Sequence, residues 1–475
     1  MRAIRMTLAT AMLTIGILVV PPVEQGAFLR AGAASSSAAL VERQFKAFEA
    51  AIGKATAQAQ QWQYTTTAQD KFDAVSYIRQ LAQLNLDTQL LALDPNHPTF
   101  FRDPDPFSVP GANPPVRSGI YDPDNISYIA IVNGTDQYRI TGKRGNSDDV
   151  SVQAISGFPG AGSTGAPTAT LLRNQIKVSS DGSYTINVGW PSQSGNWLPT
   201  VAQTTLISVR EAFNNWPRAV ADQLSIQTVG QTGTAPARLT NQKLAAAIEA
   251  ATNAVTQQGS YWTTLWGSLL SSLPANQIRT PAPTQGGLAG QLSSLSHFDL
   301  SNGQALVVSV GKSDALYQGF EAADAFAQSL PYATHESSLN ATQAQLASDG
   351  RYYFVVAAKD PGVPNWIDTE GYNEGFLFLR WQELTGALPA ADNPTSQVVP
   401  LASVRSVLPA ATPTVTPSQR KAQLAARDKA VARRVRSSSN EAQRLLTVYL
   451  RQLASAVGRG PVLSIYAGTS LRSRL

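Results

Sequence analysis

The feature that most constrains the fold of this chain is a pattern that occurs twice. Each copy has a Ser-Asp-Gly turn, a strand with apolar residues at alternate positions, an Asn-Trp pair and an arginine. The first copy comprises residues 180–182, 184–188, Asn196-Trp197 and Arg210, and the second comprises residues 348–350, 352–356, Asn365-Trp366 and Arg380. The aspartate and the tryptophan are 16 and 17 residues apart in the two copies, and the tryptophan and the arginine are 13 and 14 apart. Because such an order and spacing is typical of a duplicated unit, we expect two halves with one fold.

Short runs of β-forming residues fill both regions that carry the pattern. Within residues 125–229 and 306–384 these runs alternate with glycine, proline, asparagine and aspartate, which is typical of a β-sandwich. Apolar residues at helical spacing occur before, between and after the two regions. We therefore predict a mainly β fold, with two related β-sandwich or jelly-roll-like halves and helical N-terminal, inter-half and C-terminal segments.

The changes in pattern place the boundaries. The predicted segments are a signal peptide at 1–34, a helical segment and proline-rich loop at 35–121, the first β unit at 122–230, a helical insertion and linker at 231–300, the second β unit at 301–390, and a linker with a basic helical arm at 391–475. Residues 94–123 are rich in proline, aspartate and asparagine. A loop of this length either marks a boundary or lines a site.

The N-terminus has the order of a secretory signal. Arg2 and Arg5 precede an apolar run at residues 8–20, and the small residues Ala31-Gly32-Ala33 follow. A membrane-spanning helix needs roughly 20 apolar residues, and this run is shorter. We expect export, with cleavage near Ala33, to the cell envelope or the medium; retention of the segment as an anchor is the alternative.

The net charge and the absence of cysteine exclude several classes of function. The formal net charge of +5 is too small to indicate nucleic acid as a partner. The chain has no cysteine, which excludes disulfides, thiolate zinc sites and iron–sulfur clusters. We predict no cofactor and no metal. Two Asp-Pro-Asp sequences, at 103–105 and 122–124, could hold calcium in an exported protein, but turns formed by Asp-Pro explain them as well.

Several motifs resemble those of a known family. They are Asp122-Pro-Asp-Asn125 with Tyr128, Tyr138-Arg-Ile-Thr-Gly142 with Arg144-Gly145, Gly195-Asn-Trp-Leu-Pro199, Ser338-Leu-Asn340 with Gln343, Asp349-Gly350, and Asp360-Pro-Gly-Val-Pro-Asn-Trp-Ile-Asp368 with Gly375 and Arg380-Trp381. Together they cover about half of the chain. With these motifs the sequence resembles uncharacterised bacterial proteins that carry the domain of unknown function numbered 1214, often found beside the one numbered 1254. The resemblance implies two β-sandwich or jelly-roll units with helical additions, and it brings no catalytic residues.

The repeated residues admit two roles. The candidate ligand-binding set is Asn196, Trp197, Arg210, Asn365, Trp366 and Arg380. A tryptophan can close the open end of a sandwich, an asparagine can bond the backbone of its loop, and an arginine can pair with a loop carboxylate. Because both halves carry the set, we favour this structural role over ligand binding.

Catalytic candidates lie in the second half. His335, next to Glu336, and the carboxylates Asp360, Asp368 and Glu370 could provide acid–base groups near Trp366. The corresponding loop of the first half, residues 191–200, has no carboxylate. Ser163 stands between glycines, but its surroundings do not predict the strand-turn-helix of a hydrolase nucleophile.

Two functions from different classes remain open. The first is a non-catalytic binding module of the envelope or secreted fraction, with an unknown small molecule or an envelope glycan as partner and tryptophans such as Trp197, Trp366 and Trp381 as stacking surfaces. The alternative is a carbohydrate-active or other hydrolase that uses the carboxylates of the loop at 360–374. The C-terminal helix could also touch acidic envelope surfaces through basic residues, and a solvated helix face is the alternative. These basic residues are Arg420, Lys421, Arg427, Lys429, Arg433, Arg434 and Arg436.

Overall fold

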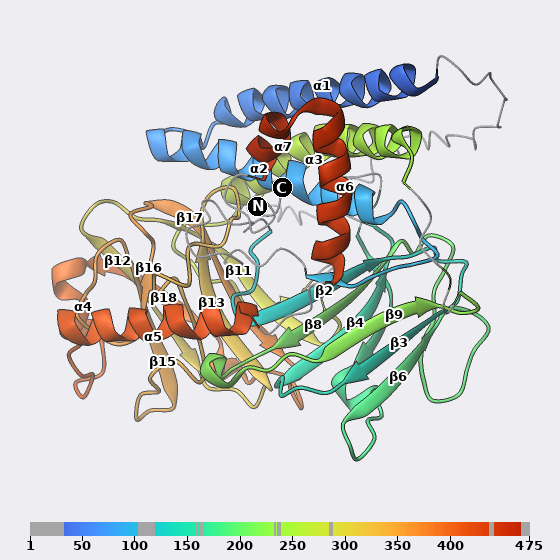
Figure 1. Ribbon diagram of the computed structural model, residues 1–475. Helices are drawn as coiled ribbons and strands as arrows, with labels where there is room; N and C mark the ends of the chain where they lie inside the picture. Colours follow the sequence, from blue (N-terminus) through green and yellow to red (C-terminus); the bar gives the residue numbers. More distant parts are fainter. Residues whose placement is uncertain are drawn as a thin grey trace, which may run out of the picture.

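The chain forms two β units, side by side, beneath a layer of helices (Figure 1). The computed structural model describes residues 33–102, 119–157, 160, 163, 165–231, 234, 239–284, 288–436 and 441–466. Residues 1–32 of the predicted signal peptide, and Asp103 and Asp105, lie outside the described residues. The four sheets form two similar halves, with helices before, between and after them, which confirms the predicted architecture.

Unit 1 contains two sheets, with strand orders β1-β2-β8-β4-β5 and β7-β6-β3-β9. Its strands are β1 (Phe101–Arg102), β2 (Asn125–Ile131), β3 (Tyr138–Lys143), β4 (Asp149–Ile155), β5 (Pro167–Leu172), β6 (Ser183–Val188), β7 (Asn196–Leu198), β8 (Leu206–Ala212) and β9 (Gln223–Thr228). Two short 3-10 helices, η1 (Arg173–Gln175) and η2 (Trp216–Arg218), lie in its loops.

Unit 2 repeats this topology strand for strand, with orders β10-β11-β17-β13-β14 and β16-β15-β12-β18. Its strands are β10 (Ala282–Pro283), β11 (Gln291–Asp299), β12 (Gln304–Gly311), β13 (Tyr317–Ala323), β14 (Ser338–Asn340), β15 (Arg351–Ala357), β16 (Trp366–Asp368), β17 (Glu374–Gln382) and β18 (Thr395–Pro400). Its 3-10 helices are η3 (Ala390–Asp392) and η4 (Leu401–Ser403). The strands therefore extend beyond the expected second unit, residues 301–390, at both ends.

The repeated pattern has the same local structure in both units. Gly182 and Gly350 have φ angles of 85° and 81°, a conformation that favours glycine, and each leads into a strand. The alternating residues of β6 and β15 then point into the two sandwich cores, which are packed separately. The Asn-Trp pair lies at the start of two short strands, since β7 begins at Asn196 and β16 begins at Trp366. These strands run parallel to β6 and β15.

The helical layer covers one side of both units. It consists of α1 (Ala33–Gln60), α2 (Ala68–Leu91), α3 (Asn241–Ser272), α6 (Glu441–Val457) and α7 (Arg459–Ile465), whose apolar faces share one core. The α2 helix begins at a capping box formed by Thr67 and Asp70. Within the described residues no helix is long and apolar enough to cross a membrane.

Two further helices lie on unit 2. The helix α4 (Val404–Val407) packs with η4 on the outer face of the β12 sheet, and α5 (Pro417–Arg436) runs along the front of unit 2 toward unit 1 (Figure 1). Arginines tie α5 to both units: Arg420 bonds to the Val363 carbonyl of unit 2, and Arg434 bonds to the Pro123 carbonyl beside unit 1. The α5 helix is therefore a brace between the two units.

Candidate ligand-binding cavity

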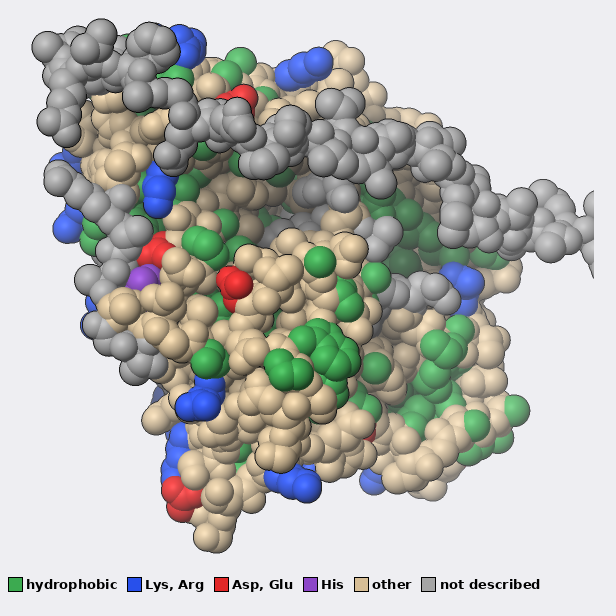
Figure 2. Space-filling model, turned by 90° about the vertical axis from the view of Figure 1, so that its right-hand side faces the viewer, with side chains coloured by type: hydrophobic (Ala, Val, Ile, Leu, Met, Phe, Trp, Pro, Cys, Tyr) green, Lys and Arg blue, Asp and Glu red, His purple; other side chains and the backbone are tan. Residues whose placement is uncertain are grey.

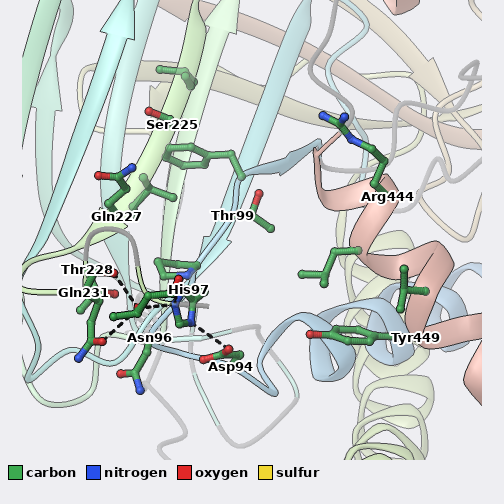
Figure 3. Close-up of a pocket in the computed structure, with 17 residues that line it drawn as sticks. Asp94, Asn96, His97, Thr99, Ser225, Gln227, Thr228, Gln231, Arg444 and Tyr449 are labelled. Atoms are coloured by element: carbon green, nitrogen blue, oxygen red, sulfur yellow. Dashed lines mark hydrogen bonds and ion pairs between the residues drawn. The ribbon is translucent and has the colours of Figure 1, made fainter. Parts of the chain in front are cut away.

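A cavity of about 650 Å³ lies on unit 1, where three segments far apart in the sequence meet. Its walls are the edge strand β9, residues 94–100 between α2 and β1, and the helix α6 (Figure 3). Figure 2 shows the end of unit 1, whose visible surface is mostly uncharged, with hydrophobic patches and scattered basic and acidic side chains. The acidic, basic and histidine residues of the cavity lining are Asp94, Arg444 and His97.

The β9 wall presents unpaired backbone groups. The strand pairs with β3 on one side only, and the Val229 amide donates to the Gln137 carbonyl at 2.8 Å. Because hydrogen-bonded positions alternate in an antiparallel pair, the N–H and C=O groups of Leu224 and Ile226, and the N–H of Thr228, point away from β3. All three residues line the cavity, and within the described chain these groups have no partner.

The Thr228 hydroxyl is a second unsatisfied group on this wall. Thr228 is only 8% exposed, and among the described residues its Oγ1 has no hydrogen-bond partner. A buried hydroxyl without a partner costs about 1–3 kcal/mol. A ligand or an ordered water in the cavity would remove that cost.

His97 ties the second wall to the turn that follows β9. Its Nδ1 lies 2.9 Å from the Asp94 carboxylate, and its Nε2 lies 2.8 Å from Thr234 Oγ1 and 3.1 Å from the Thr234 carbonyl (Figure 3). The Thr234 hydroxyl in turn donates to the Gln231 carbonyl at 2.7 Å. These bonds hold the two sides of the cavity at a fixed separation.

The α6 wall is apolar with a basic rim. Val448 leaves 59% of its surface exposed beside Leu445 and the buried Tyr449, and Arg444 lies at the edge of the cavity (Figure 3). The cavity thus combines a hydrogen-bonding strand edge with a hydrophobic helix face.

The asparagines of the repeated pattern are fully engaged within the fold. The Asn196 amide exchanges hydrogen bonds with the Lys177 backbone at 2.8 and 2.9 Å. The Asn365 amide does the same with the Gln345 backbone at 2.7 and 2.8 Å. Ligand binding by these two residues stays a prediction, and their observed contacts close loops.

The two tryptophans of the pattern differ in exposure. Both indole N–H groups donate to a backbone carbonyl at the end of a strand: Trp197 to Gly189, directly after β6, at 2.7 Å, and Trp366 to Ala357, the last residue of β15, at 2.8 Å. Trp366 is 7% exposed and lies under the Arg420 guanidinium, whereas Trp197 is half-buried. Trp197 packs edge-on against Trp190, which is 59% exposed and which the sequence analysis did not single out. Trp381 is fully buried.

The two arginines of the pattern also differ. Arg380 is buried, pairs with Glu321, and donates to the Ile120 carbonyl at 2.6 Å. Its guanidinium also lies 3.8 Å from Asp122, in a loop beside unit 1. Arg210 lies on the corresponding strand of unit 1 and is half-buried.

The family motifs around Asp122 and Asn340 meet in a buried network between the units. Tyr317 donates to Asp122 and Asp124, each at 2.9 Å, and Asn340 and Trp216 also donate to Asp124. Burial, followed by the charge of Asp122, raises the pKa of Asp124 to about 6. Within the described residues no group of three or more metal-ligating side chains is placed to hold a metal ion.

Three of the four catalytic candidates lie together. His335 Nδ1 is 2.9 Å from Asp368, and its Nε2 is 3.8 Å from Glu370. The fourth, Asp360, instead pairs with Arg420 of α5 at 3.0 Å. The cluster has a base and two carboxylates, although none of these residues lines the cavity on unit 1.

The basic residues of α5 divide into two groups. Arg420 pairs with Glu336 and Asp360, Arg427 bonds to Ser338, and Arg433 bonds to the Pro217 carbonyl. Arg434 is buried, while Lys421 and Lys429 are exposed. Contact with an acidic envelope surface stays a prediction that these two lysines would have to support.

Most of the cavity residues were not predicted from the sequence. Residues 94–123 were predicted to be a loop that marks a boundary or lines a site, and Asp94 and residues 96–100 do line the cavity. The other two walls are contributed by segments roughly 130 and 350 residues further along the chain. Only the tertiary fold brings these walls together.

Comparison with known proteins gives a similarity of fold. No family model matches the chain, and no curated protein matches it. A crystal structure of an uncharacterised protein from Burkholderia cenocepacia matches with 24% identity and a TM-score of 0.69, over 77% of this chain and 99% of that chain. The VPA0106 protein from Vibrio parahaemolyticus matches over 76% of this chain and 100% of that chain, with 11% identity and a TM-score of 0.38, which is too low to carry an argument. The chain therefore resembles an uncharacterised bacterial protein in fold.

Proposed function

We propose that this protein is an exported, non-catalytic binding module of the bacterial envelope or secreted fraction, and that the cavity on unit 1 holds its ligand. The observation that carries this proposal is the unsatisfied edge of β9 and Thr228 Oγ1, inside a cavity that also has an apolar wall. Buried polar groups are usually paired, so a place where several stay unpaired beside free volume is suited to a ligand.

We extend the proposal to export and family. The order of Arg2, Arg5, the apolar run and Ala31-Gly32-Ala33 supports export. The motifs at Asp122, Asn340 and Arg380 support a relationship to the proteins with the domains of unknown function numbered 1214 and 1254. In this chain those motifs contribute to the buried network between the units.

The test is ligand-induced stabilisation of the full chain. We would measure the unfolding temperature with neutral oligosaccharides and with short uncharged peptides, in the wild type and in the Val448→Asp variant, which places a charge on the apolar wall. Val398→Asp, at an exposed position on β18 of unit 2, is the matched control. A ligand that stabilises the wild type and the control but not Val448→Asp supports the proposal, and a ligand that stabilises all three equally contradicts it.

The cluster of His335, Asp368 and Glu370 supports a second candidate, a hydrolase that cleaves a glycosidic bond or an ester bond. A histidine between two carboxylates can transfer protons. If the cluster is catalytic, His335→Ala should abolish hydrolysis of a chromogenic glycoside or ester while the protein stays folded. Equal rates in the variant and the wild type would exclude this role.

A further inference from the structure

We propose that the ligand of the unit 1 cavity is an extended peptide that adds a strand to the free edge of β9. This inference rests on the proposed function, since it names the ligand class of the same site. The partner is a segment of another polypeptide, about five residues long, uncharged, with apolar side chains at alternate positions.

The spacing of the unpaired groups supports a polypeptide partner. Among the described residues, the backbone groups of Leu224, Ile226 and Thr228 that have no partner recur every second residue, which is about 6.6 Å along a strand. A second β-strand offers donors and acceptors at this same repeat, whereas the hydroxyls of a glycan do not. Strand addition is a recurrent mode of peptide recognition, in which main-chain hydrogen bonds give affinity and pockets for alternate side chains give specificity.

The edge of β9 lacks the usual protection against such pairing. In many proteins, proline or charged side chains on an edge strand prevent it from pairing with another chain. Residues 223–228 contain neither. In unit 2 the corresponding edge strand, β18, follows Pro394 and ends in Pro400, and Ser396 Oγ bonds to Ile278 N and the Asn276 carbonyl. The segment before unit 2 is thus tied to β18, while the segment before unit 1 leaves a cavity.

The α6 wall determines which side chains of the peptide fit the cavity. A strand paired with β9 places alternate side chains toward α6, where Leu445 and Val448 contribute apolar side chains to the cavity lining. Apolar residues at those positions would cover the exposed part of Val448. The β9 wall has no charge, so an uncharged peptide fits it.

The length of the peptide follows from the length of the β9 segment that lines the cavity. The part of β9 that lines the cavity, Leu224 to Thr228, is five residues long and spans about 17 Å. A peptide of similar length can pair along it without leaving the cavity.

The experiment measures binding of a synthetic peptide to the full chain by fluorescence anisotropy. The probe is an eight-residue peptide of alternating threonine and valine with a fluorescent label at its end. Two further peptides carry N-methyl groups on alternate amides, one on each edge of the strand. We expect one N-methylated peptide to bind at least tenfold more weakly than the unmodified peptide, and the other to bind within about threefold of it. Equal binding of both would overturn strand addition.

Variants of Leu224 test the same bonds from the side of the protein. The Leu224 amide points away from β3, so Leu224→Pro removes a donor of the free edge without removing a bond of the β3–β9 ladder. Leu224→Ala also removes most of the leucine side chain but keeps the backbone N–H. We expect Leu224→Pro to bind the peptide at least tenfold more weakly than Leu224→Ala, with similar unfolding temperatures. Equal affinities of the two folded variants would contradict the proposal.

The outcomes separate this inference from the proposed function. If an oligosaccharide stabilises the wild type but not Val448→Asp, and the peptide does not bind, the cavity is a binding site and the peptide inference is wrong. If neither probe is affected by Val448→Asp, both proposals fail.

Discussion

The outer faces of the two four-stranded sheets are built on the same topology, yet one is covered and the other is open. In unit 2 this face carries Val307 and Val355, and η4 and α4 pack on it. In unit 1 the positions of the same register are Arg139, which is exposed, and Asn187, which is half-buried, and no described helix packs on them. The same strand order therefore forms with different residues on the outer face. Those residues decide whether the face is covered by helices or exposed.

The sandwich edges extend this comparison. In unit 2 the linker after α3 bonds to β18 through Ser396, and α5 covers Trp366 through Arg420. In unit 1 the linker after α2 leaves the cavity beside β9, and Trp197 stays half-buried. Unit 2 is therefore the more enclosed copy, and unit 1 has the free surface on which we place binding.

The largest effect is expected from exchanging the residues of the two outer faces. Val307 is 3% exposed, so Val307→Arg buries an unpaired charge beneath α4 and should lower the free energy of unfolding by about 4 kcal/mol or more. The reciprocal Arg139→Val changes an exposed side chain and should stay within about 0.5 kcal/mol of the wild type. Urea unfolding of both variants measures this; equal losses would contradict the difference between the faces.

A smaller difference should separate the two tryptophans. Trp366→Ala removes a buried indole from beneath Arg420 and should cost about 3–5 kcal/mol of unfolding free energy. Trp197→Ala should cost about 1–2 kcal/mol, because its indole is only half-buried and leaves a smaller cavity. Denaturant unfolding followed by circular dichroism compares them, and a greater loss for Trp197→Ala would reverse our ranking of the units.

The pH dependence of stability offers a third contrast. Asp149 of unit 1 occupies the register position of Tyr317 in unit 2, and burial, followed by the charge of Glu383, raises the pKa of Asp149 to about 6. Because the folded-state pKa is above the ordinary value of 3.8, the contribution of this carboxyl to stability is fully present below about pH 4 and is lost as the pH rises through about 6.

Replacing this carboxyl should therefore remove part of the pH dependence. We expect Asp149→Asn to match the wild type near pH 4 and to be more stable by about 1–3 kcal/mol at pH 8. Unfolding midpoints in urea at the two pH values measure the effect. A difference between variant and wild type that is the same at both pH values would show that Asp149 is not the titrating group.

The smallest effect concerns the edge of unit 2. Ser396→Ala removes the two hydrogen bonds that tie β18 to residues 276 and 278, and should cost about 0.5–1.5 kcal/mol. Ser225→Ala on β9 loses an exposed bond to Thr141 and should cost less. If the two losses were equal in thermal unfolding, the tie at Ser396 would not distinguish the two edges.

The repeat was enough to predict the duplicated architecture, because turn glycines and alternating apolar residues act locally. It did not reveal β11, in which Ser293, Ser294, Ser296 and His297 interrupt the apolar alternation, or β18, which follows Pro394 and ends in Pro400. The repeated residues did not predict the cavity either. Asn196 and Asn365 form the same loop-closing hydrogen bonds in both halves. The cavity is formed by residues that differ between the halves.

Binding of a peptide at the edge of β9 is tested most directly by hydrogen–deuterium exchange of the full chain, with and without the threonine–valine peptide. The two edge strands, β9 and β18, serve as matched segments in one molecule. We expect the peptide to slow exchange in the segment containing Leu224 and Ile226 and to leave exchange in the segment containing Ser396 and Val398 unchanged. Equal slowing of both edges, or slowing of β18 alone, would contradict the assignment of binding to unit 1.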